Sequence, residues 1–198
     1  VLTLPPLSLY VHLPWCERKC PYCDFNSHQP SGEPPFEAYV DALLEDLEGD
    51  LPWAQGRSCQ TIFIGGGTPS LFPGRAIRRL LDGVRERLPL LDDAEITLEA
   101  NPGSAEAARF AAYREAGVNR LSIGVQSFDD ASLAALGRVH DSRAAHAAVA
   151  AARAAGFSNI NLDLMHGLPG QDPAAAARDI ETAMAHAVPH LSWYQLTI

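Results

Sequence analysis

The sequence predicts an α/β fold in which six parallel strands alternate with helices. Six short apolar runs, rich in β-branched or aromatic residues, have the pattern of buried strands and cover residues 7–13, 61–65, 95–100, 120–125, 159–165 and 191–198. Helical patterns separate these runs, and such alternation builds parallel βαβ units with right-handed crossovers. Six units make either an open doubly wound sheet or most of a barrel.

The predicted helices begin and end at recognisable signals. Apolar residues recur at helical spacing over 36–51, after Pro34-Pro35, and again from Pro73-Gly74 to Leu88. The other signals are Ser104 as a cap and Gly117 as a stop, Asp129 before a short helix, Ser142 as the cap of an alanine-rich helix ending at Gly156, and Asp172 as a cap followed by Pro173.

Composition indicates a globular protein and argues against several kinds of partner. The chain has 198 residues, 47% of them apolar, which is enough for one large domain with a buried core. A net charge of −9 and the lack of a Lys/Arg run make nucleic acid an improbable partner. No segment reaches the roughly 20 apolar residues of a membrane span. The first 16 residues also lack the charged leader of a signal peptide.

We therefore expect a cytoplasmic protein, in which clustered cysteines are metal or redox ligands rather than a disulfide framework. The chain begins at Val1 without a methionine and stops within the sixth predicted strand. We expect residues 1–198 to be a single domain that forms the N-terminal part of a longer protein.

Unusual residues follow the C-terminal end of nearly every predicted strand. In chain order they are the cysteines of 16–23, "GGGTPS" (65–70), "EANPG" (99–103), "GVQSF" (124–128) and "DLMHGLPGQ" (163–171). In a parallel α/β barrel the active site lies at this end, because all the βα loops converge there. The sequence therefore predicts one site built from five loops.

Three cysteines, Cys16, Cys20 and Cys23, form a C-x3-C-x2-C motif on one short loop. A structural zinc site normally has four protein ligands, and His12 or His28 could serve as the fourth. Three thiolates can instead hold three irons of a [4Fe-4S] cluster and leave one iron free for another ligand. We favour the cluster over zinc and over unligated packing cysteines.

Three other residues with metal-binding side chains are expected to be structural. Cys59, before the second predicted strand, lies at the other end of the sheet and should be a packing or surface thiol. His12 should hydrogen-bond loop backbone, because three thiolates are already present, and His140 should lie on the surface at a helix end.

The cysteine motif is shared by radical S-adenosylmethionine (SAM) enzymes, and the resemblance extends beyond it. The chain resembles the oxygen-independent coproporphyrinogen oxidase group, and more closely its HemW-type heme chaperone branch, in the order and spacing of six motifs. These motifs are "LYVHLPWCERKCPYCDFNSH", "FIGGGTPS", "LEANPG", "RLSIGVQSF", "LGRVH" and "NINLDLMHGLPGQ". The resemblance runs from Tyr10 to the end of the chain. It implies a six-unit (β/α)6 partial TIM-like barrel, the radical SAM core domain.

The same resemblance implies the cofactors and their binding residues. The amine and carboxylate of SAM would bind the free iron of the cluster, which explains why a fourth thiolate is missing. The residues implied to contact SAM are Tyr10, Tyr22, Gly66, Gly67, Thr68, Glu99, Gln126, Arg138 and Asp163. Heme or a porphyrin would be the cargo, and heme-accepting proteins would be the partners.

Residue types alone leave simpler roles open at some of these positions. The three glycines from Gly65 could form a turn between strand and helix, and Glu99 could be a solvated or helix-capping residue. Asp163 lies among apolar residues, where a charge needs a partner, and Arg138 could provide one in a buried ion pair.

The chain departs from the oxidases at Phe25. The oxidases carry a fourth cysteine two positions after the third, and this chain has Phe25 there. The difference favours a heme chaperone over the alternative, an oxygen-independent coproporphyrinogen III oxidase that performs oxidative decarboxylation in porphyrin biosynthesis. A zinc-stabilised interaction module is the least favoured class, because only three ligands cluster. In both favoured families, regions that bind heme or substrate would lie beyond Ile198.

Overall fold

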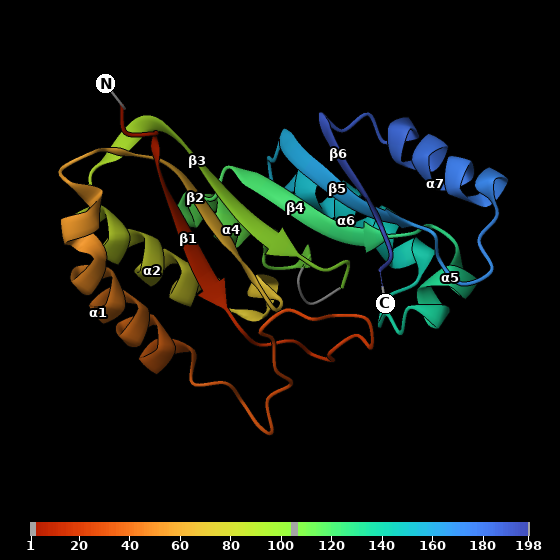
Figure 1. Ribbon diagram of the computed structural model, residues 1–198, viewed down its shortest axis with the longest axis horizontal. Coiled ribbons are helices and arrows are strands. Elements are labelled where there is room, and N and C mark those ends of the chain that lie inside the picture. Colours follow the sequence, from red (N-terminus) through yellow and green to blue (C-terminus); the bar gives the residue numbers. More distant parts are fainter. Residues whose placement is uncertain (1–2, 104–106, 198) are drawn as a thin grey trace.

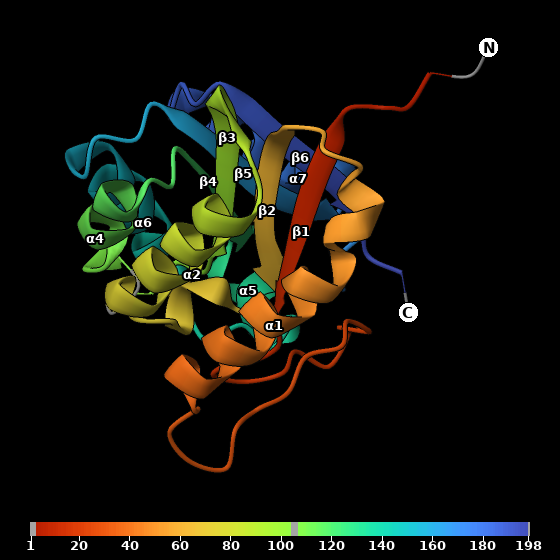
Figure 2. The same cartoon turned by 90° about the vertical axis from the view of Figure 1, so that its left-hand side faces the viewer.

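A computed structural model describes residues 3–103 and 107–197. Six strands form one parallel sheet in the order of the sequence: β1 (Leu7–Leu13), β2 (Cys59–Gly66), β3 (Leu90–Ala100), β4 (Arg120–Gln126), β5 (Asn159–His166) and β6 (His190–Gln195). Because the strand order never reverses and crossovers share one hand, the long helices lie on one face of the sheet (Figures 1 and 2). The prediction of parallel βαβ units is confirmed, and the doubly wound alternative is wrong.

The sheet curves into a partial barrel. Within the described residues, β1 pairs only with β2 and β6 only with β5, so the two outer strands do not close the sheet. This matches the six-unit partial barrel that the family resemblance implied. All six strands end at one edge, and the segment between β1 and α1 lies against that edge (Figure 2).

Helices and a short 3-10 turn connect the strands: α1 (Phe36–Ala54), η1 (Pro69–Leu71), α2 (Gly74–Arg87), α4 (Phe110–Ala116), α5 (Asp130–Ala135), α6 (Ser142–Ala154) and α7 (Pro173–Ala185). Three of them begin with an aspartate cap whose carboxylate accepts a backbone N–H: Asp129 for α5, Asp141 for α6 and Asp172 for α7.

One predicted cap was wrong by a single residue. Asp141, and not Ser142, caps α6, because the Asp141 carboxylate accepts the N–H of Ala144 at 2.7 Å and leaves Ser142 as the first helical residue. Gly117 ends α4 in a left-handed conformation, as predicted. The predicted cap at Ser104 lies outside the described residues.

The two faces of the sheet differ in polarity, and this difference determines where the core lies. Outward side chains such as Val11, Ile62 and Leu98 are buried against the helices in one continuous apolar cluster. Inward side chains are mostly polar and bond to each other, as Ser122 does with Asn161. The core therefore fills the layer between sheet and helices and leaves the inside of the barrel polar.

Cys59 opens β2 at the end of the sheet opposite to the other cysteines. Its side chain is fully buried in the core cluster, and burial raises the pKa of its thiol. The prediction of a packing thiol is confirmed. In the part of the chain that the structure describes, no helix combines the length and hydrophobicity needed to cross a bilayer.

Candidate cofactor site

A cavity of about 370 Å³ lies at the C-terminal ends of the strands. Every predicted site residue except Tyr10 lines it: Cys16, Cys20, Tyr22, Cys23, Gly66, Gly67, Thr68, Glu99, Gln126, Arg138 and Asp163. These residues come from five strands or from the loops that follow them, as expected for a barrel whose βα loops converge.

The cysteine loop is held by short backbone bonds at its two ends. The N–H of Cys16 donates to the His28 carbonyl at 2.9 Å, and the N–H of His28 donates to the Pro14 carbonyl at 2.8 Å. His12 supports the same loop, because its Nε2 lies 2.8 Å from the Asn26 carbonyl. The prediction that His12 bonds loop backbone is confirmed.

The three thiols are free and border the same cavity. Among the described residues, no three His, Cys, Asp or Glu side chains converge closely enough to hold a single metal ion. A zinc ion needs all its ligand atoms within about 2.3 Å of one point, whereas each thiolate of a [4Fe-4S] cluster binds a different iron. Three thiols on one loop, at one cavity, fit the ligand set of such a cluster.

Gly66 and Gly67 let the cysteine loop lie directly against the end of β2. A Cβ on Gly66 would lie 2.8 Å from the His12 ring, and one on Gly67 would lie 2.7 Å from the carbonyl oxygens of Pro14 and Trp15. Gly66 also has a φ of 119°, which strongly favours glycine. The glycines thus serve a close backbone approach at the cavity in addition to a turn.

Glu99 is the penultimate residue of β3, and its side chain lines the cavity. Its Oε2 accepts the N–H of Gly66 at 3.2 Å, so it is neither freely solvated nor a helix cap. Burial raises its pKa to about 7, and the nearby charge of Asp163 acts in the same direction. A cationic ligand group in this cavity would favour the ionised form.

Asp163, on β5, is held by neutral partners. Its carboxylate accepts the Ser122 hydroxyl at 2.8 Å and the Asn161 amide at 2.9 Å, and Asn161 also donates to Ser192 on β6. Burial raises the pKa of Asp163. No ion pair joins it to Arg138 in the described part of the chain, so the predicted alternative of a buried ion pair is wrong.

Arg138, in the loop after α5, bonds to the other side of the cavity. Its Nη2 donates to Asn101 Oδ1 at 2.6 Å and to the Gly124 carbonyl at 3.1 Å. Its Nη1 lies 3.5 Å from the sulfur of Cys20, while its Nε is buried and has no hydrogen-bond partner among the described residues. Arg138 therefore places a cation beside a candidate cluster ligand.

Gln126 lines the cavity and has a left-handed backbone conformation, which is unusual for a residue other than glycine. Its φ is 67°, and the pairing of β4 with β5 shifts register between Ile123 and Gln126. Its Oε1 accepts the hydroxyl of Tyr194 at 2.5 Å, and burial raises the pKa of Tyr194. Tyr194 lines the cavity, although the sequence showed it only as one aromatic residue of a strand.

Two residues lie differently from their predicted positions. Tyr10, which the resemblance implied to contact SAM, lies in the middle of β1, and its hydroxyl bonds to His12 Nδ1 at 3.0 Å outside the cavity lining. His140 is buried instead of surface-exposed, because its ring turns under β4 and bonds to the Val125 carbonyl at 3.0 Å. Burial lowers the pKa of His140 to about 4.

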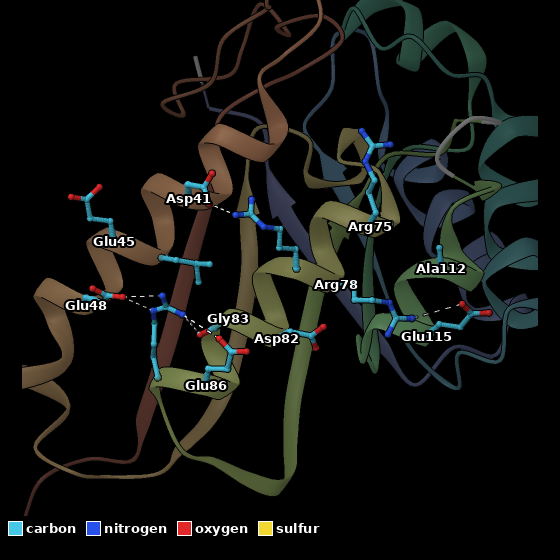
Figure 3. A pocket seen from close by; sticks show the side chains of 14 residues that line it. Asp41, Glu45, Glu48, Arg75, Arg78, Asp82, Gly83, Glu86, Ala112 and Glu115 are labelled. Carbon is cyan, nitrogen blue, oxygen red and sulfur yellow. Dashed lines mark hydrogen bonds and ion pairs between the residues drawn. The ribbon is translucent and has the colours of Figure 1, made fainter.

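A larger groove of about 800 Å³ lies on the helical side of the molecule (Figure 3). It runs between α1, α2 and α4, and most of its charged side chains pair across helices, as Arg87 does with Glu48 at 2.9 Å and Arg78 with Glu115 at 3.8 Å. The groove is therefore explained by ion pairs between packed helices, away from the strand ends.

Comparison with known proteins identifies the family. The model of the Radical SAM superfamily matches residues 10–183. The heme chaperone HemW of Escherichia coli is 59% identical over the whole chain, and HemW of Haemophilus influenzae is 51% identical over 98% of it. The match covers 52% of each of these relatives, so the chain spans about half their length.

The solved structures agree with this assignment. The coproporphyrinogen III oxidase HemN of Escherichia coli superposes with a TM-score of 0.87 and 33% identity, over 97% of this chain and 44% of HemN. Methylornithine synthase, at 13% identity and a TM-score of 0.67, shares the fold. Because the family model covers most of the sequence and the fold agrees, the chain belongs to the radical SAM superfamily.

Proposed function

We propose that the protein containing this chain is a heme chaperone, which binds a [4Fe-4S] cluster and SAM and delivers heme to acceptor proteins. The observation that carries the proposal is the identity of 59% and 51%, over nearly the whole chain, with two proteins named heme chaperone HemW. Since the chain spans about half of those relatives, the proposal concerns the whole protein, with residues 1–198 as its radical SAM core domain. It places the protein in the cytoplasm, which keeps free thiols reduced.

Cys16, Cys20 and Cys23 would hold the cluster. They share one loop, border one cavity and leave no fourth thiol there. When bound and reduced, such a cluster supplies the electron for reductive cleavage of SAM.

The cavity residues would bind and orient SAM around that cluster. Glu99 would pair with a cationic group, since an opposite charge favours its ionised form. Gly66 and Gly67 would let the cysteine loop, and with it the cluster, lie close to the ligand. Thr68 and Gln126 would offer polar side chains from the loop after β2 and the end of β4. The guanidinium of Arg138 would place a positive charge beside Cys20, on the side of the ligand that faces the cluster.

A coproporphyrinogen III oxidase is the second candidate, because HemN has the same fold over 97% of this chain. Phe25 argues against it. It lines the cavity with 63% of its surface exposed, at the position where the oxidases carry a cysteine. An aromatic ring there provides no thiol for the decarboxylation site.

The decisive experiment compares heme transfer with decarboxylation in the full-length protein. A heme chaperone should bind heme, transfer it to an apo-acceptor, and form no protoporphyrinogen from coproporphyrinogen under reducing, SAM-replete, anaerobic conditions. The variant Cys20→Ala controls for cluster dependence. Steady decarboxylation that requires Cys20 and SAM would overturn the chaperone proposal and support the oxidase.

A further inference from the structure

We infer that Asn101 is a positioning residue of the SAM site: its side-chain amide determines which way the Thr68 hydroxyl donates and holds the guanidinium of Arg138 beside Cys20. The inference rests on the proposed function, because it assumes that SAM binds in this cavity. Asn101 lies directly after β3 and lines the cavity between the loops that carry Thr68 and Arg138.

The orientation of the Asn101 amide follows from the chemistry of its two partners. Arg138 Nη2 lies 2.6 Å from Asn101 Oδ1, and a guanidinium can only donate, so the carbonyl oxygen must face Arg138. The amide nitrogen then faces Thr68, with 3.0 Å between Nδ2 and Oγ1. An amide nitrogen also only donates, so the Thr68 oxygen is the acceptor.

Thr68 is thereby left with a hydroxyl proton to donate. Its side chain is buried, and within the described residues its hydroxyl has no hydrogen bond other than the one from Asn101. A hydroxyl that accepts on one side donates most readily on the other. Thr68 should therefore donate to an oxygen of the ligand, such as a carboxylate or a ribose hydroxyl of SAM.

The backbone of Asn101 is anchored, and this holds its side-chain amide in place between the two partners. The backbone N–H of Asn101 donates to the Ser70 hydroxyl at 3.3 Å, and Ser70 is fully buried. The Ser70 carbonyl in turn accepts the Arg109 guanidinium at 2.7 Å. The loop that carries Asn101 is thus tied to the loop that carries Thr68.

Gly124 provides the space in which these groups meet. A Cβ at this position would lie 2.9 Å from Gln126 Nε2, 3.3 Å from Asn101 Oδ1 and 3.6 Å from Arg138 Nη2. Without a side chain there, the guanidinium can reach both the Gly124 carbonyl and Asn101. Asn101 is therefore the shared partner of two walls of the cavity.

The test is the affinity for SAM of the anaerobically reconstituted protein, measured by equilibrium dialysis alongside the electron paramagnetic resonance spectrum of the reduced cluster. Asn101→Asp keeps the size of the side chain, but a carboxylate can only accept hydrogen bonds. The Thr68 hydroxyl would then donate to residue 101 and no longer to the ligand. We expect Kd for SAM to rise about tenfold or more, the change expected from losing a well-placed hydrogen bond. Thr68→Val should weaken binding similarly. In the double variant, the rise in Kd should be smaller than the product of the two single rises, because both substitutions act through one hydroxyl.

Asn119→Asp is the matched control. The Asn119 amide also bridges two groups, accepting the Ile96 N–H at 2.7 Å and donating to the Ala94 carbonyl at 2.8 Å, but at the opposite end of the sheet. It should lower thermal stability and leave Kd for SAM unchanged, whereas Asn101→Asp should change Kd at full iron content.

The possible outcomes separate this inference from the proposed function. If the parent protein binds SAM and Asn101→Asp binds within twofold of it, the positioning role is overturned and the proposed function stands. If the rise in Kd in the double variant equals the product of the two single rises, the link through Thr68 is overturned as well. If the parent protein holds its cluster but does not bind SAM, the proposed function fails first.

Discussion

Arg138 and Cys20 lie in contact at the cavity, with 3.5 Å between Nη1 and the thiol sulfur, although they are 118 positions apart in the sequence. The contact joins the loop after α5 to the cysteine loop after β1. A positive charge and an N–H donor beside a cluster ligand stabilise the more negative, reduced cluster. We therefore expect Arg138 to raise the reduction potential of a cluster bound at Cys20.

The substitution Arg138→Met tests this role, because it removes the charge and keeps most of the length of the side chain. We expect the cluster midpoint potential without SAM to fall by roughly 50 mV, about a tenfold change in a one-electron equilibrium. The measurement is a redox titration followed by electron paramagnetic resonance. Arg143→Met, on the exposed start of α6, is the control, and equal potentials in the two variants would argue against the contact.

The cysteines make a second prediction. Anaerobic reconstitution should give close to four irons and four sulfides per chain, and a brown chromophore that air destroys. Alanine at Cys16, Cys20 or Cys23 should abolish it, because each thiolate binds a different iron. Cys59→Ala should retain the full iron content, although loss of a buried side chain lowers stability. Stoichiometric zinc without iron would contradict the cluster.

Residue patterns were sufficient to predict parallel βα units and the edge of the sheet that carries the site, whereas the choice of a partial barrel over a doubly wound sheet came from the family resemblance. Apolar runs alternating with helical patterns predict parallel units, and parallel strands end at the same edge, so motifs at strand ends had to meet. For this reason Glu99 and Asp163 could be assigned to one cavity from patterns 64 positions apart.

The polar contacts inside the cavity were harder to predict. Tyr194 and Ser122 are ordinary strand residues by type, and their roles depend on partners in other strands that periodicity does not identify. Asn101 was within a recognised motif, but its two partners lie 33 and 37 positions away. At α6, Asp141 and Ser142 are adjacent and cap helices about equally well, so only the observed hydrogen bond distinguishes them.

His140 makes a third prediction, about stability in acid. Burial lowers its pKa to about 4 in the folded protein from a usual value of 6.5, so below pH 6.5 the unfolded chain binds more protons. Stability is therefore lost as the pH falls from 6.5 towards 4, by on the order of 2 to 3 kcal/mol from this residue. His140→Gln, which can still donate to Val125, should remove that loss in urea unfolding of the iron-free protein. His190→Gln, at an exposed position on β6, should not.

Glu99 gives a fourth prediction, in which stability changes with pH in the opposite direction over nearly the same pH range. Its pKa is raised from 4.5 to about 7, so between these values the folded protein binds the extra proton and stability falls as the pH rises. Glu99→Gln can still accept the Gly66 N–H and lacks the buried charge. We expect it to be more stable than the parent above pH 7, by on the order of 2 to 3 kcal/mol, and equally stable below pH 4.5.

Because the contributions of Glu99 and His140 have opposite signs, they largely cancel in the parent protein and are separated only in the variants. Urea unfolding of the iron-free protein at pH 4, 5.5, 7 and 8 measures both. Glu45→Gln, at an exposed position on α1, is the matched control and should follow the parent throughout. If Glu99→Gln gives no gain at pH 8, the carboxylate is stabilised as an anion in the empty cavity, and SAM need not provide the cation that keeps it charged.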